Sequence, residues 1–596
     1  MGALGRASTA AVAAATVVAL ALAAGPATEG AGAAPAEQSR PNVVVLMSDD
    51  QTQDSMRYMP RTQELIGDQG ATFPTNVTNW PLCCPSRATF QTGRYAHNHG
   101  VLGNSPPLGG FDRLDLANTL PVWLQDSGYY TAHIGKFLNG YEGSAVGVPP
   151  GWSEWHGSKS TYRFYGYQLL ENGQIVTYGN PDEDPDNPAD PASYSTDVYS
   201  QKAVDLIQQR APSNQPFFLS VAYLAPHGGG PNNPPAQPQF RCDDTAKPAI
   251  RHAGALESEP LPQPPSFNEA DISDKPAALA GREPLTQAEI NRARRFYRCR
   301  GESLFAIDES VAAVIDALRE SGELNNTIVI YTADNGFFHG EHRIVSGKNR
   351  VYEEAIRVPL LMRGPGIPRG VTVDDITINA DLPPTILDAA GAQATVPQDG
   401  RSLLPFAEEP DRAHGRELLI EQHSPDGEDG EPTGTEYQAI RTTKYIYVQN
   451  ASGETELYDL EADPFQLDNQ QANPAYAEAK AALAGRLAAL VSCQGESCRS
   501  RPAMELKLPR EKRADGKRCA QPRGFVARVR NRAQSRLVSV VFRVNDEKVG
   551  EDGAAPFKRR LPIKALRERP SAEIETDAEL VDGRMLTLHE RVKICR

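Results

Sequence analysis

Two short runs of consecutive apolar residues stand out from the mixed pattern of the chain. Residues 42–47 read NVVVLM and residues 327–332 read TIVIYT, and both are rich in β-branched side chains. A continuous apolar run between polar turns is typical of a strand that is buried on both faces, as in a parallel sheet covered by helices. We therefore expect both runs to be central strands of one sheet.

A helical pattern precedes the second of these runs. The apolar residues of the clearest repeat are Leu304, Ile307, Val311, Val314, Ile315 and Leu318. Their spacing of three and four predicts an amphipathic helix, and Ser303 is the candidate start. Strands that alternate with such helices indicate an α/β fold, with the sheet sandwiched between helices.

The pattern changes after about residue 415. Short alternating runs (YQAIR, YIYVQ, TELYDL) are followed by a helical stretch over residues 476–491, which predicts a small antiparallel sheet with one helix. The last segment alternates again (FVARVR, LVSVVFRV, LTLHERVKI) and predicts a small β-sandwich. We expect a main α/β domain over 37–415, an antiparallel subdomain over 416–505 and a β-sandwich domain over 510–596.

The first residues have the pattern of an export signal. Arg6 precedes an uncharged run over residues 7–24, and small residues follow up to Ala36. This pattern predicts a signal peptide over residues 1–36. No later segment approaches the roughly 20 uncharged apolar residues that a membrane span needs. We expect a secreted, extracellular protein without a membrane span.

Charge is unevenly distributed along the chain. The formal net charge is -15, yet the residues from Lys507 to the end carry more Lys and Arg than Asp and Glu. The β-sandwich domain is therefore expected to be a basic module joined to an acidic one. It is a candidate for contact with a polyanionic glycan or the cell wall. A stabilising lid is the alternative, and no nucleic-acid partner is expected.

The eight cysteines divide into candidate pairs and a vicinal couple. Spacing suggests the pairs Cys242 with Cys299, Cys493 with Cys498, and Cys519 with Cys595, although sequence alone does not fix the connectivity. Cys83 and Cys84 are left over. Adjacent cysteines are poor disulfide partners, because a strain-free bridge needs Cα atoms farther apart than one peptide step. Another use for one of the two must be considered.

An acidic pair follows each apolar run. Asp49-Asp50 comes after the first run and Asp334-Asn335 after the second. In α/β sheets, ligands collect at the carboxyl ends of the strands. A cluster of hard oxygens there favours Ca2+ or Mg2+ over a transition metal. The alternative is that these residues only cap helices and start turns, as Asp and Asn often do.

The stretch CCPSR at residues 83–87 has the features of an anion-binding helix start. Pro85 suits the first position of a helix, and a group just ahead of it would meet free backbone N–H groups. Arg87 would add a permanent charge with the geometry to grip a tetrahedral oxyanion. The alternative is an ordinary helix start with a surface arginine.

This stretch, followed by Thr92-Gly93-Arg94, resembles the signature of the type I sulfatases, C-x-P-S-R with T-G-R after it. The resemblance implies an alkaline-phosphatase-like fold. It also implies that a formylglycine-generating enzyme oxidises the first cysteine of the motif to Cα-formylglycine, whose hydrated aldehyde is the nucleophile. Cys83 has Pro two positions on and Arg four positions on, so the implied modification falls on Cys83. Cys84 then occupies a variable position.

The resemblance covers most of residues 40–500 and implies further site residues. The metal ligands would be Asp49, Asp50, Asp334 and Asn335 with the oxygen at position 83, usually on calcium and less often on magnesium. The motifs GKFLNGY, LAPH and GKNRVYEEAIRVPL place Lys136, His227 and Lys348 on catalytic residues of the family, beside Arg87.

Two positions depart from the family pattern. Gln91 stands where the longer motif has Leu or Met, which bears on recognition by the modifying enzyme. Leu138 stands where arylsulfatases have a second histidine, and a leucine cannot hydrogen-bond sulfate.

The function implied by the resemblance is hydrolysis of sulfate monoesters to an alcohol and inorganic sulfate. The sequence is similar to the branch that contains N-acetylglucosamine-6-sulfatases and heparan endosulfatases. Sulfated amino sugars, as in glycosaminoglycans, or aryl sulfates are the expected substrates. His227 would be the acid toward the leaving alcohol, with Lys348 as the other candidate. The alternatives are a phosphonate monoester or phosphodiester hydrolase on the same fold, and a glycan-binding protein with a vestigial site.

Overall fold

The structure is a computed structural model in which the chain is described from Arg40 onward, with short gaps. The described residues are 40–180, 190–229, 242, 245–422, 437–512, 518–520, 525–533, 535–562, 564, 566 and 569–595. The expected signal peptide, residues 1–36, lies outside the described residues.

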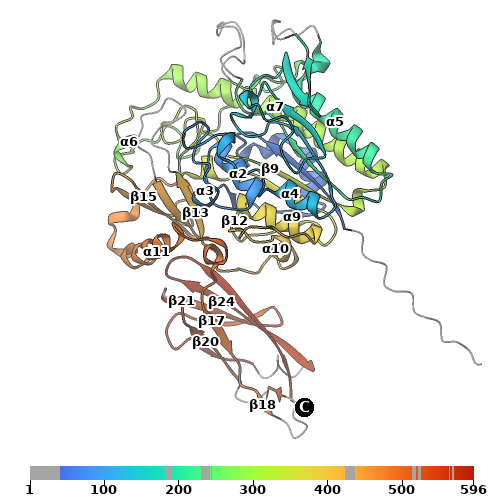
Figure 1. The fold of residues 1–596 in the computed structure, drawn as a ribbon. Coiled ribbons are helices and arrows are strands. Elements are labelled where there is room, and N and C mark those ends of the chain that lie inside the picture. Colours follow the sequence, from blue (N-terminus) through green and yellow to red (C-terminus); the bar gives the residue numbers. More distant parts are fainter. Residues whose placement is uncertain are drawn as a thin grey trace, which may run out of the picture. The chain divides into compact units, whose positions relative to one another are not determined.

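A ten-stranded sheet forms the centre of the main domain (Figure 1), in the order β11-β2-β10-β9-β1-β8-β4-β5-β6-β7. Its middle strands are β1 (Asn42–Ser48) and β9 (Thr327–Ala333), which are parallel neighbours, with Leu46 opposite Tyr331. Every residue of both strands is buried. The prediction of two central strands in one sheet is confirmed.

The remaining strands extend the sheet on both sides of this pair. They are β2 (Ala71–Thr72), β4 (Tyr130–Gly135), β5 (Glu154–Ser158), β6 (Tyr167–Glu171), β7 (Gln174–Tyr178), β8 (Phe217–Ala222), β10 (Leu360–Arg363) and β11 (Val371–Thr372). The run from β9 through β1, β8 and β4 to β5 is parallel, whereas β10, β6 and β7 are antiparallel to a neighbour. The carboxyl ends of five strands therefore meet at one edge.

Helices cover both faces of this sheet. On one face lie α5 (Ser195–Arg210) and α7 (Gln287–Glu320), and on the other α2 (Cys83–Thr92), α4 (Leu120–Asp126) and α9 (Leu382–Ala390). Val44 and Leu46 pack toward the first group, while Val43 and Val45 pack toward the second. Because alternate side chains meet two different apolar layers, β1 shows no polar alternation.

Helix α7 begins earlier than the sequence predicts. The expected start at Ser303 is wrong, because the helix starts at Gln287 with a capping box. Glu289 N donates to Thr286 Oγ1 (3.3 Å), and Thr286 N donates to Glu289 Oε2 (2.7 Å). The first half of the helix is rich in charged residues and lacks the regular apolar spacing, so periodicity alone finds only the buried half.

Shorter elements connect these layers. They are α1 (Pro60–Thr62), α3 (Ala96–His99), α6 (Ala277–Ala280), α8 (Glu353–Ile356) and α10 (Leu404–Glu408), with β3 (Asn76–Val77) and β12 (Thr377–Ile378) as a parallel pair.

A four-stranded antiparallel sheet follows the main domain, as the alternating pattern predicts. It consists of β13 (Leu418–Gln422), β14 (Tyr437–Arg441), β15 (Tyr445–Asn450) and β16 (Thr455–Asp459), with α11 (Ala477–Leu490) after it. Leu483 and Leu487 of α11 belong to the same apolar cluster as Ile440 and Ile446 of the sheet. The expected helix over residues 476–491 is confirmed.

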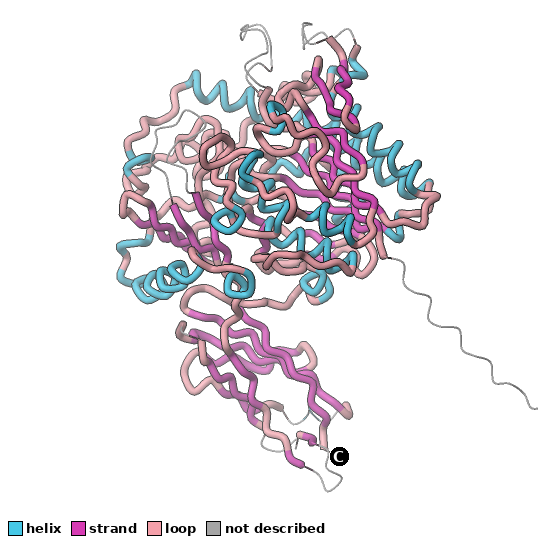
Figure 2. The backbone as a smooth tube through the Cα atoms, viewed as in Figure 1, coloured by secondary structure: helices cyan, strands magenta, loops and turns pink. Residues whose placement is uncertain are grey.

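The last segment forms two antiparallel sheets (Figure 2, magenta) that share one apolar core. One sheet holds β17 (Met504–Lys507), β20 (Val526–Asn531) and β23 (Lys558–Arg560); the other holds β21 (Leu537–Val544), β22 (Glu547–Asp552), β24 (Ser571–Leu580) and β25 (Met585–Lys593). A two-stranded ribbon, β18 (Glu511–Lys512) with β19 (Arg518–Cys519), accompanies them. Alternate residues such as Val529 and Val540 face the shared core. This is the expected β-sandwich.

Contacts join this β-sandwich to the antiparallel subdomain. Arg584 Nη1 lies 3.1 Å from Glu417 Oε2, and both side chains are buried. Arg536 makes two hydrogen bonds to Glu478 of α11, at 2.6 and 2.8 Å. The domain boundaries expected from the sequence remain predictions.

The three cysteine pairs expected from spacing are confirmed. The disulfides join Cys242 to Cys299, Cys493 to Cys498, and Cys519 to Cys595. Cys83 and Cys84 are buried thiols outside any disulfide. Among the described residues, no helix is both long enough and apolar enough to span a membrane.

One glycine links the sheet to the residues beyond its carboxyl edge. Gly135 ends β4 with φ 101°, and a Cβ atom there would lie 2.1 Å from the carbonyl oxygen of Ala222 on β8. We expect Gly135→Ala to lower the free energy of unfolding by about 2 kcal/mol or more, through strain and clash. Chemical denaturation measures this. Gly143→Ala is the matched control, since no atom lies within 4 Å of its added carbon, and equal stability of the two variants would contradict the prediction.

Candidate active site

The two acidic pairs meet at the carboxyl edge of the sheet. Asp49 and Asp50 follow β1, and Asp334 and Asn335 follow β9, so parallel pairing brings them side by side. The Asp50 backbone N–H donates to Asp334 Oδ1 (2.9 Å), and Asn335 Nδ2 donates to Asp50 Oδ1 (2.7 Å). The structure thus places all four predicted metal ligands in one cluster.

Cys83 faces this cluster from the start of α2. Its Sγ lies 3.5 Å from Asp49 Oδ1 and 4.0 Å from Asp50 Oδ1. The helix begins at Cys83, so the expectation that Pro85 takes the first helical position is wrong by two residues. Cys83 itself therefore lies in the first turn, where backbone N–H groups favour an anion. Cys84 belongs to the apolar cluster under the sheet instead.

Two lysines compensate the buried carboxylates. Lys348 Nζ donates to Cys83 Sγ (2.7 Å) and forms an ion pair with Asp50. Lys136 is the residue directly after β4, and it forms an ion pair with Asp49. Both lysine side chains are at most 4 % exposed. A buried charge needs a close partner of opposite sign. Lys136 is this partner for Asp49, and Lys348 is this partner for Asp50.

Arg87 completes the positive side of the cluster. Its Nε donates to Asp334 Oδ2 (2.8 Å), and its Nη2 lies 3.4 Å from Asp49 Oδ2. Among the described residues, this Nη2 group makes no hydrogen bond although it is buried. The arginine therefore has an unused donor at the acidic cluster, which is the property expected of a group that binds a substrate oxyanion.

These charges set the protonation states in the cluster. Burial alone would raise the pKa of Asp49, but the positive groups around it, Lys136 first among them and then His227, Arg87 and Lys348, together outweigh burial and lower the pKa. The pKa of Asp50 is also lowered: burial would raise it, but Lys348 and the other positive groups nearby together outweigh burial. Burial and the negative charge of Asp49 raise the pKa of the Cys83 thiol well above its usual value. As a cysteine, residue 83 is therefore a neutral thiol and not a thiolate nucleophile.

The donor atoms fit a hard divalent cation. One donor atom from each of Asp49, Asp50, Cys83 and His227 lies within 4.8 Å of all the others. Asn335 Oδ1 is buried, and it accepts no hydrogen bond in the described part of the chain. Asp50 has a left-handed backbone with φ 62°, which is strained for a residue other than glycine. The carboxylate oxygens of Asp49 and Asp50 and the unpaired oxygen of Asn335 are hard donors of the kind that calcium binds.

His227 lies at the rim of the cluster. Its Nδ1 donates to the Gly228 carbonyl oxygen (2.7 Å), which leaves Nε2 facing Asp50 Oδ2 at 3.6 Å. Burial lowers the pKa of His227 to about 4, against the opposite effect of the aspartates, so the imidazole is neutral at neutral pH. Two electron-pair donors thus face each other, an arrangement that a cation stabilises.

Tyr162 is a site residue that sequence reasoning missed. Its ring centroid lies 5.0 Å from that of His227 and 5.2 Å from Lys136 Nζ. Its hydroxyl group accepts a hydrogen bond from Asn139 Nδ2 (2.6 Å). The ring thus contacts both Lys136 and His227, two of the predicted catalytic residues. Tyr162 lies in a loop without periodicity, so no sequence signal marks it.

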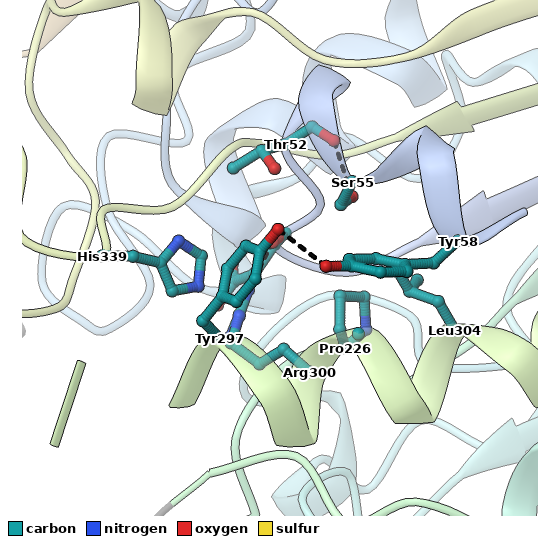
Figure 3. Close-up of a pocket in the computed structure, with 10 residues that line it drawn as sticks. Thr52, Ser55, Tyr58, Pro226, Tyr297, Arg300, Leu304 and His339 are labelled. Carbon is teal, nitrogen blue, oxygen red and sulfur yellow. Dashed lines mark hydrogen bonds between the residues drawn. The ribbon is translucent and has the colours of Figure 1, made fainter. Parts of the chain in front are cut away.

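Arg300 of α7 is a second missed residue. Its guanidinium group donates to the backbone oxygen of Asp50 and stacks on Phe337, with 3.8 Å from Cζ to the ring centroid. Figure 3 shows it beside a cavity of about 20 Å³, where the hydroxyl groups of Tyr58 and Tyr297 are hydrogen-bonded (2.7 Å). The cavity has room for about one water molecule. Arg300 therefore stabilises the strained backbone of Asp50 through this hydrogen bond.

Leu138 is buried in the apolar cluster under the sheet. This placement agrees with the expectation that it makes no polar contact with a sulfate group.

The sheet order and the oxygen-rich cluster at its carboxyl edge define an α/β protein with a mixed sheet between two layers of helices. Residues 41–392 match the sulfatase family, and residues 340–492 match the family described as N-sulphoglucosamine sulphohydrolase, C-terminal. The chain is 31% identical to human N-acetylglucosamine-6-sulfatase over 503 residues, which cover 77% of this chain and 86% of that protein. The chain belongs to the sulfatase family.

Alignments with other relatives cover a smaller share of those proteins. The arylsulfatase of Volvox carteri is 33% identical over 523 residues, which cover 78% of this chain and 76% of that protein. The extracellular sulfatase SULF-1 homolog of Drosophila melanogaster is 33% identical over 377 residues, or 62% of this chain. The chain spans only 32% of that protein's length and 49% of the Sulf-1 homolog of Caenorhabditis elegans.

Solved structures share the fold. A structure in complex with its substrate D-glucosamine-2-N,6-O-disulfate superposes with a TM-score of 0.59 at 24% identity, covering 75% of this chain and 97% of the other. The phosphonate monoester hydrolase of Agrobacterium radiobacter gives a TM-score of 0.55 at 22% identity, covering 80% and 99%. At these identities the likeness concerns the fold alone.

The contacts of Tyr162 predict a graded effect of substitution. We expect Tyr162→Ala to reduce kcat/KM for sulfate ester hydrolysis about tenfold, because Lys136 and His227 lose their shared aromatic contact. Tyr162→Phe keeps the ring and should stay within about threefold of the parent protein. Steady-state kinetics on an aryl sulfate measures both. Equal losses in the two variants would show that the hydroxyl group, and not the ring, matters.

Proposed function

We propose that the protein is an exported enzyme that hydrolyses sulfate monoesters to an alcohol and inorganic sulfate. The observation that supports this most strongly is the position of Cys83. Its Sγ faces Asp49 at 3.5 Å and accepts a hydrogen bond from Lys348 at 2.7 Å, at a helix start. A nucleophile here would meet a sulfate group among cations, as hydrolysis of an anionic ester requires.

Three cations would bind the sulfate group. Arg87, Lys136 and Lys348 lie around residue 83, and each also contacts an aspartate. Their positions are fixed before substrate arrives, so they stabilise the charge of the transition state with little reorganisation. Arg87 has the fork geometry for two sulfate oxygens, whereas the lysines act as point charges.

Residue 83 would act as Cα-formylglycine. Its hydrated aldehyde supplies one hydroxyl group for attack on sulfur and a second whose deprotonation releases sulfate. The raised pKa of the unmodified thiol supports this reading, because a protonated thiol is a weak nucleophile. Lys348 would hold the hydroxyl groups of residue 83 in place through its short contact to that side chain.

Asp49, Asp50, Asp334 and Asn335, with residue 83, would hold Ca2+, or less favourably Mg2+. Bound there, the ion would act as a Lewis acid toward the nucleophile and the sulfate oxygens. The protein itself keeps Asp50 in its strained conformation through two contacts to the Asp50 backbone. The backbone N–H donates to Asp334, and the backbone carbonyl oxygen accepts from Arg300.

Lys348 is the better candidate for the acid that protonates the leaving alcohol. Burial alone would lower its pKa, but the negative groups around it, Asp50 first among them, together outweigh burial and raise the pKa well above its usual value. The lysine is therefore protonated at neutral pH, whereas the imidazole of His227 is neutral. His227 would instead orient the substrate by hydrogen bonding at the rim.

The proposed substrates are sulfated amino sugars of glycosaminoglycan type, with aryl sulfates as an alternative. This follows from the relatives, which include N-acetylglucosamine-6-sulfatases, extracellular sulfatases and arylsulfatases. The buried Leu138 supports the first class, since it cannot serve as the second histidine of arylsulfatases. Three disulfides and extracellular relatives support a secreted location.

A formylglycine-generating enzyme is the proposed maturation partner. Cys83 is 1% exposed, and Gln91 is also buried. An enzyme that modifies this motif needs access to it, so the conversion must take place before the chain folds. Incubating folded, unmodified protein with the modifying enzyme is therefore expected to yield no formylglycine.

Substitution separates the roles of the two cysteines. Cys83→Ala should abolish turnover and leave the unfolding midpoint nearly unchanged, because its side chain packs mostly against polar groups. Cys84→Ala is the matched control; it should keep substantial activity and lose about 1 kcal/mol of stability, since its side chain lies in the apolar cluster. Steady-state kinetics and denaturation on both variants test this, and equal loss of activity would refute the assignment.

A comparison of substrates separates the proposal from its rival. A phosphonate monoester or phosphodiester hydrolase shares the fold. We expect kcat/KM for a p-nitrophenyl sulfate or a 6-sulfated glucosamine to exceed that for a matched phosphodiester by at least 100-fold, a difference that corresponds to about 2.7 kcal/mol. A higher kcat/KM for the phosphodiester would favour the rival.

A further inference from the structure

We propose that the outward face of the sheet β17-β20-β23 is a binding site for sulfated glycan chains. This face belongs to the β-sandwich, away from the acidic cluster described above. The inference rests on the proposed function for its choice of ligand, and on strand register and charge for its location.

Strand register places three cations directly opposite one another. Lys507 of β17 pairs with Arg528 of β20, and Arg528 pairs in turn with Lys558 of β23. Directly paired residues project from the same face of a sheet. Arg528 alternates with the buried Ala527 and Val529, so this row faces away from the apolar core. Neighbouring strands lie about 4.8 Å apart, and the row therefore crosses roughly 10 Å of surface.

The neighbouring positions on this face add more positive charge. Arg530 and Arg560 lie two residues along their strands from Arg528 and Lys558, and a period of two keeps them on the same face. Glu505 of β17 is the one acidic residue among the described positions of these strands. It lies opposite Arg530 in register, and its carboxylate forms ion pairs with Lys507 and Arg532. Positive charge therefore exceeds negative charge on this face.

Such a row costs stability in the absence of an anion. Like charges directly opposite one another in a sheet are destabilising. The chain as a whole carries a net charge of -15, so overall attraction does not draw polyanions to it. A local concentration of Lys and Arg on an acidic protein is the pattern of a specific polyanion site.

Charge complementarity and side-chain type favour a sulfated glycan over a nucleic acid. Proteins that bind single-stranded nucleic acid combine a basic groove with aromatic rings for base stacking. The outward positions named above carry no aromatic ring. A sulfated glycan presents regularly spaced anions without bases, and it is the polymer on which the proposed activity would act.

A binding measurement on inactive protein tests this site. The background is full-length Cys83→Ala protein, and the probe is immobilised heparin, a heavily sulfated glycan. We expect the triple variant R528Q/R530Q/K558Q to bind heparin about 100-fold more weakly at low salt, with a shallower dependence on salt. Chemically desulfated heparin should bind the parent protein and R528Q/R530Q/K558Q with equal affinity.

The matched control removes the same charge elsewhere. Arg61, Arg292 and Arg369 are exposed in the main domain. The variant R61Q/R292Q/R369Q should bind heparin within about twofold of the parent, because local charge and not net charge decides binding. Equal losses in the two triple variants would overturn the assignment to this face.

Three further results would also overturn it. The first is unchanged heparin binding by R528Q/R530Q/K558Q. The second is tighter binding of single-stranded DNA than of heparin at equal salt. The third is loss of binding only in R518Q/K593Q, which changes a separate basic cavity of about 170 Å³ beside Cys519.

Measurements of Tm and of hydrolysis by the triple variant distinguish glycan binding from a purely structural role of these cations. They also test glycan binding independently of the proposed activity. If the cations only maintained the fold, the triple variant would lose thermal stability; relief of repulsion predicts an equal or higher Tm instead. In matured protein, the triple variant should hydrolyse a small aryl sulfate normally and a sulfated polymer with a raised KM. Failure of all sulfate hydrolysis with intact heparin binding would count against the proposed function and leave this site standing.

Discussion

The parallel pairing of β1 with β9 is the constraint on which the candidate active site depends. Each strand ends in an acidic pair, and the pairing in register brings the pairs together at one edge of the sheet. Buried carboxylates at such close range repel one another unless positive charge is supplied. Three residues from other parts of the chain supply this positive charge: Arg87, Lys136 and Lys348.

This electrostatic requirement explains several features that look independent in the sequence. Gly135 lets β4 end close against β8, so that the next residue, Lys136, reaches Asp49. Helix α2 begins at residue 83, which turns the cysteine toward the acidic cluster and Cys84 into the apolar layer. Arg300 secures the strained backbone of Asp50 from the opposite side. The site is thus assembled from the sheet edge, the start of one helix, and the cations Arg87, Lys136 and Lys348.

Sequence patterns predict the parts of this arrangement that depend on local periodicity. The buried strands and the alternating strands after residue 415 follow from local composition and spacing. The structure forms the three suggested cysteine pairs, although sequence alone does not fix their connectivity. The start of α7 does not, because its first half is charged and is fixed by the Thr286 capping box. Tyr162 and Arg300 also escape prediction, since their roles come from contacts with residues far away in the chain. The roles of Lys136, His227 and Lys348 depend on the family resemblance, because an isolated lysine or histidine carries no signal of its own.

The proposed mechanism requires residue 83 to act as formylglycine and not as cysteine. The most direct measurement is mass spectrometry of the peptide that contains residue 83, on preparations matured to different extents, together with turnover per protein molecule. We predict that turnover rises in proportion to the fraction of formylglycine and vanishes with it. Full turnover in protein that carries only cysteine at position 83 would rule out formylglycine as the nucleophile.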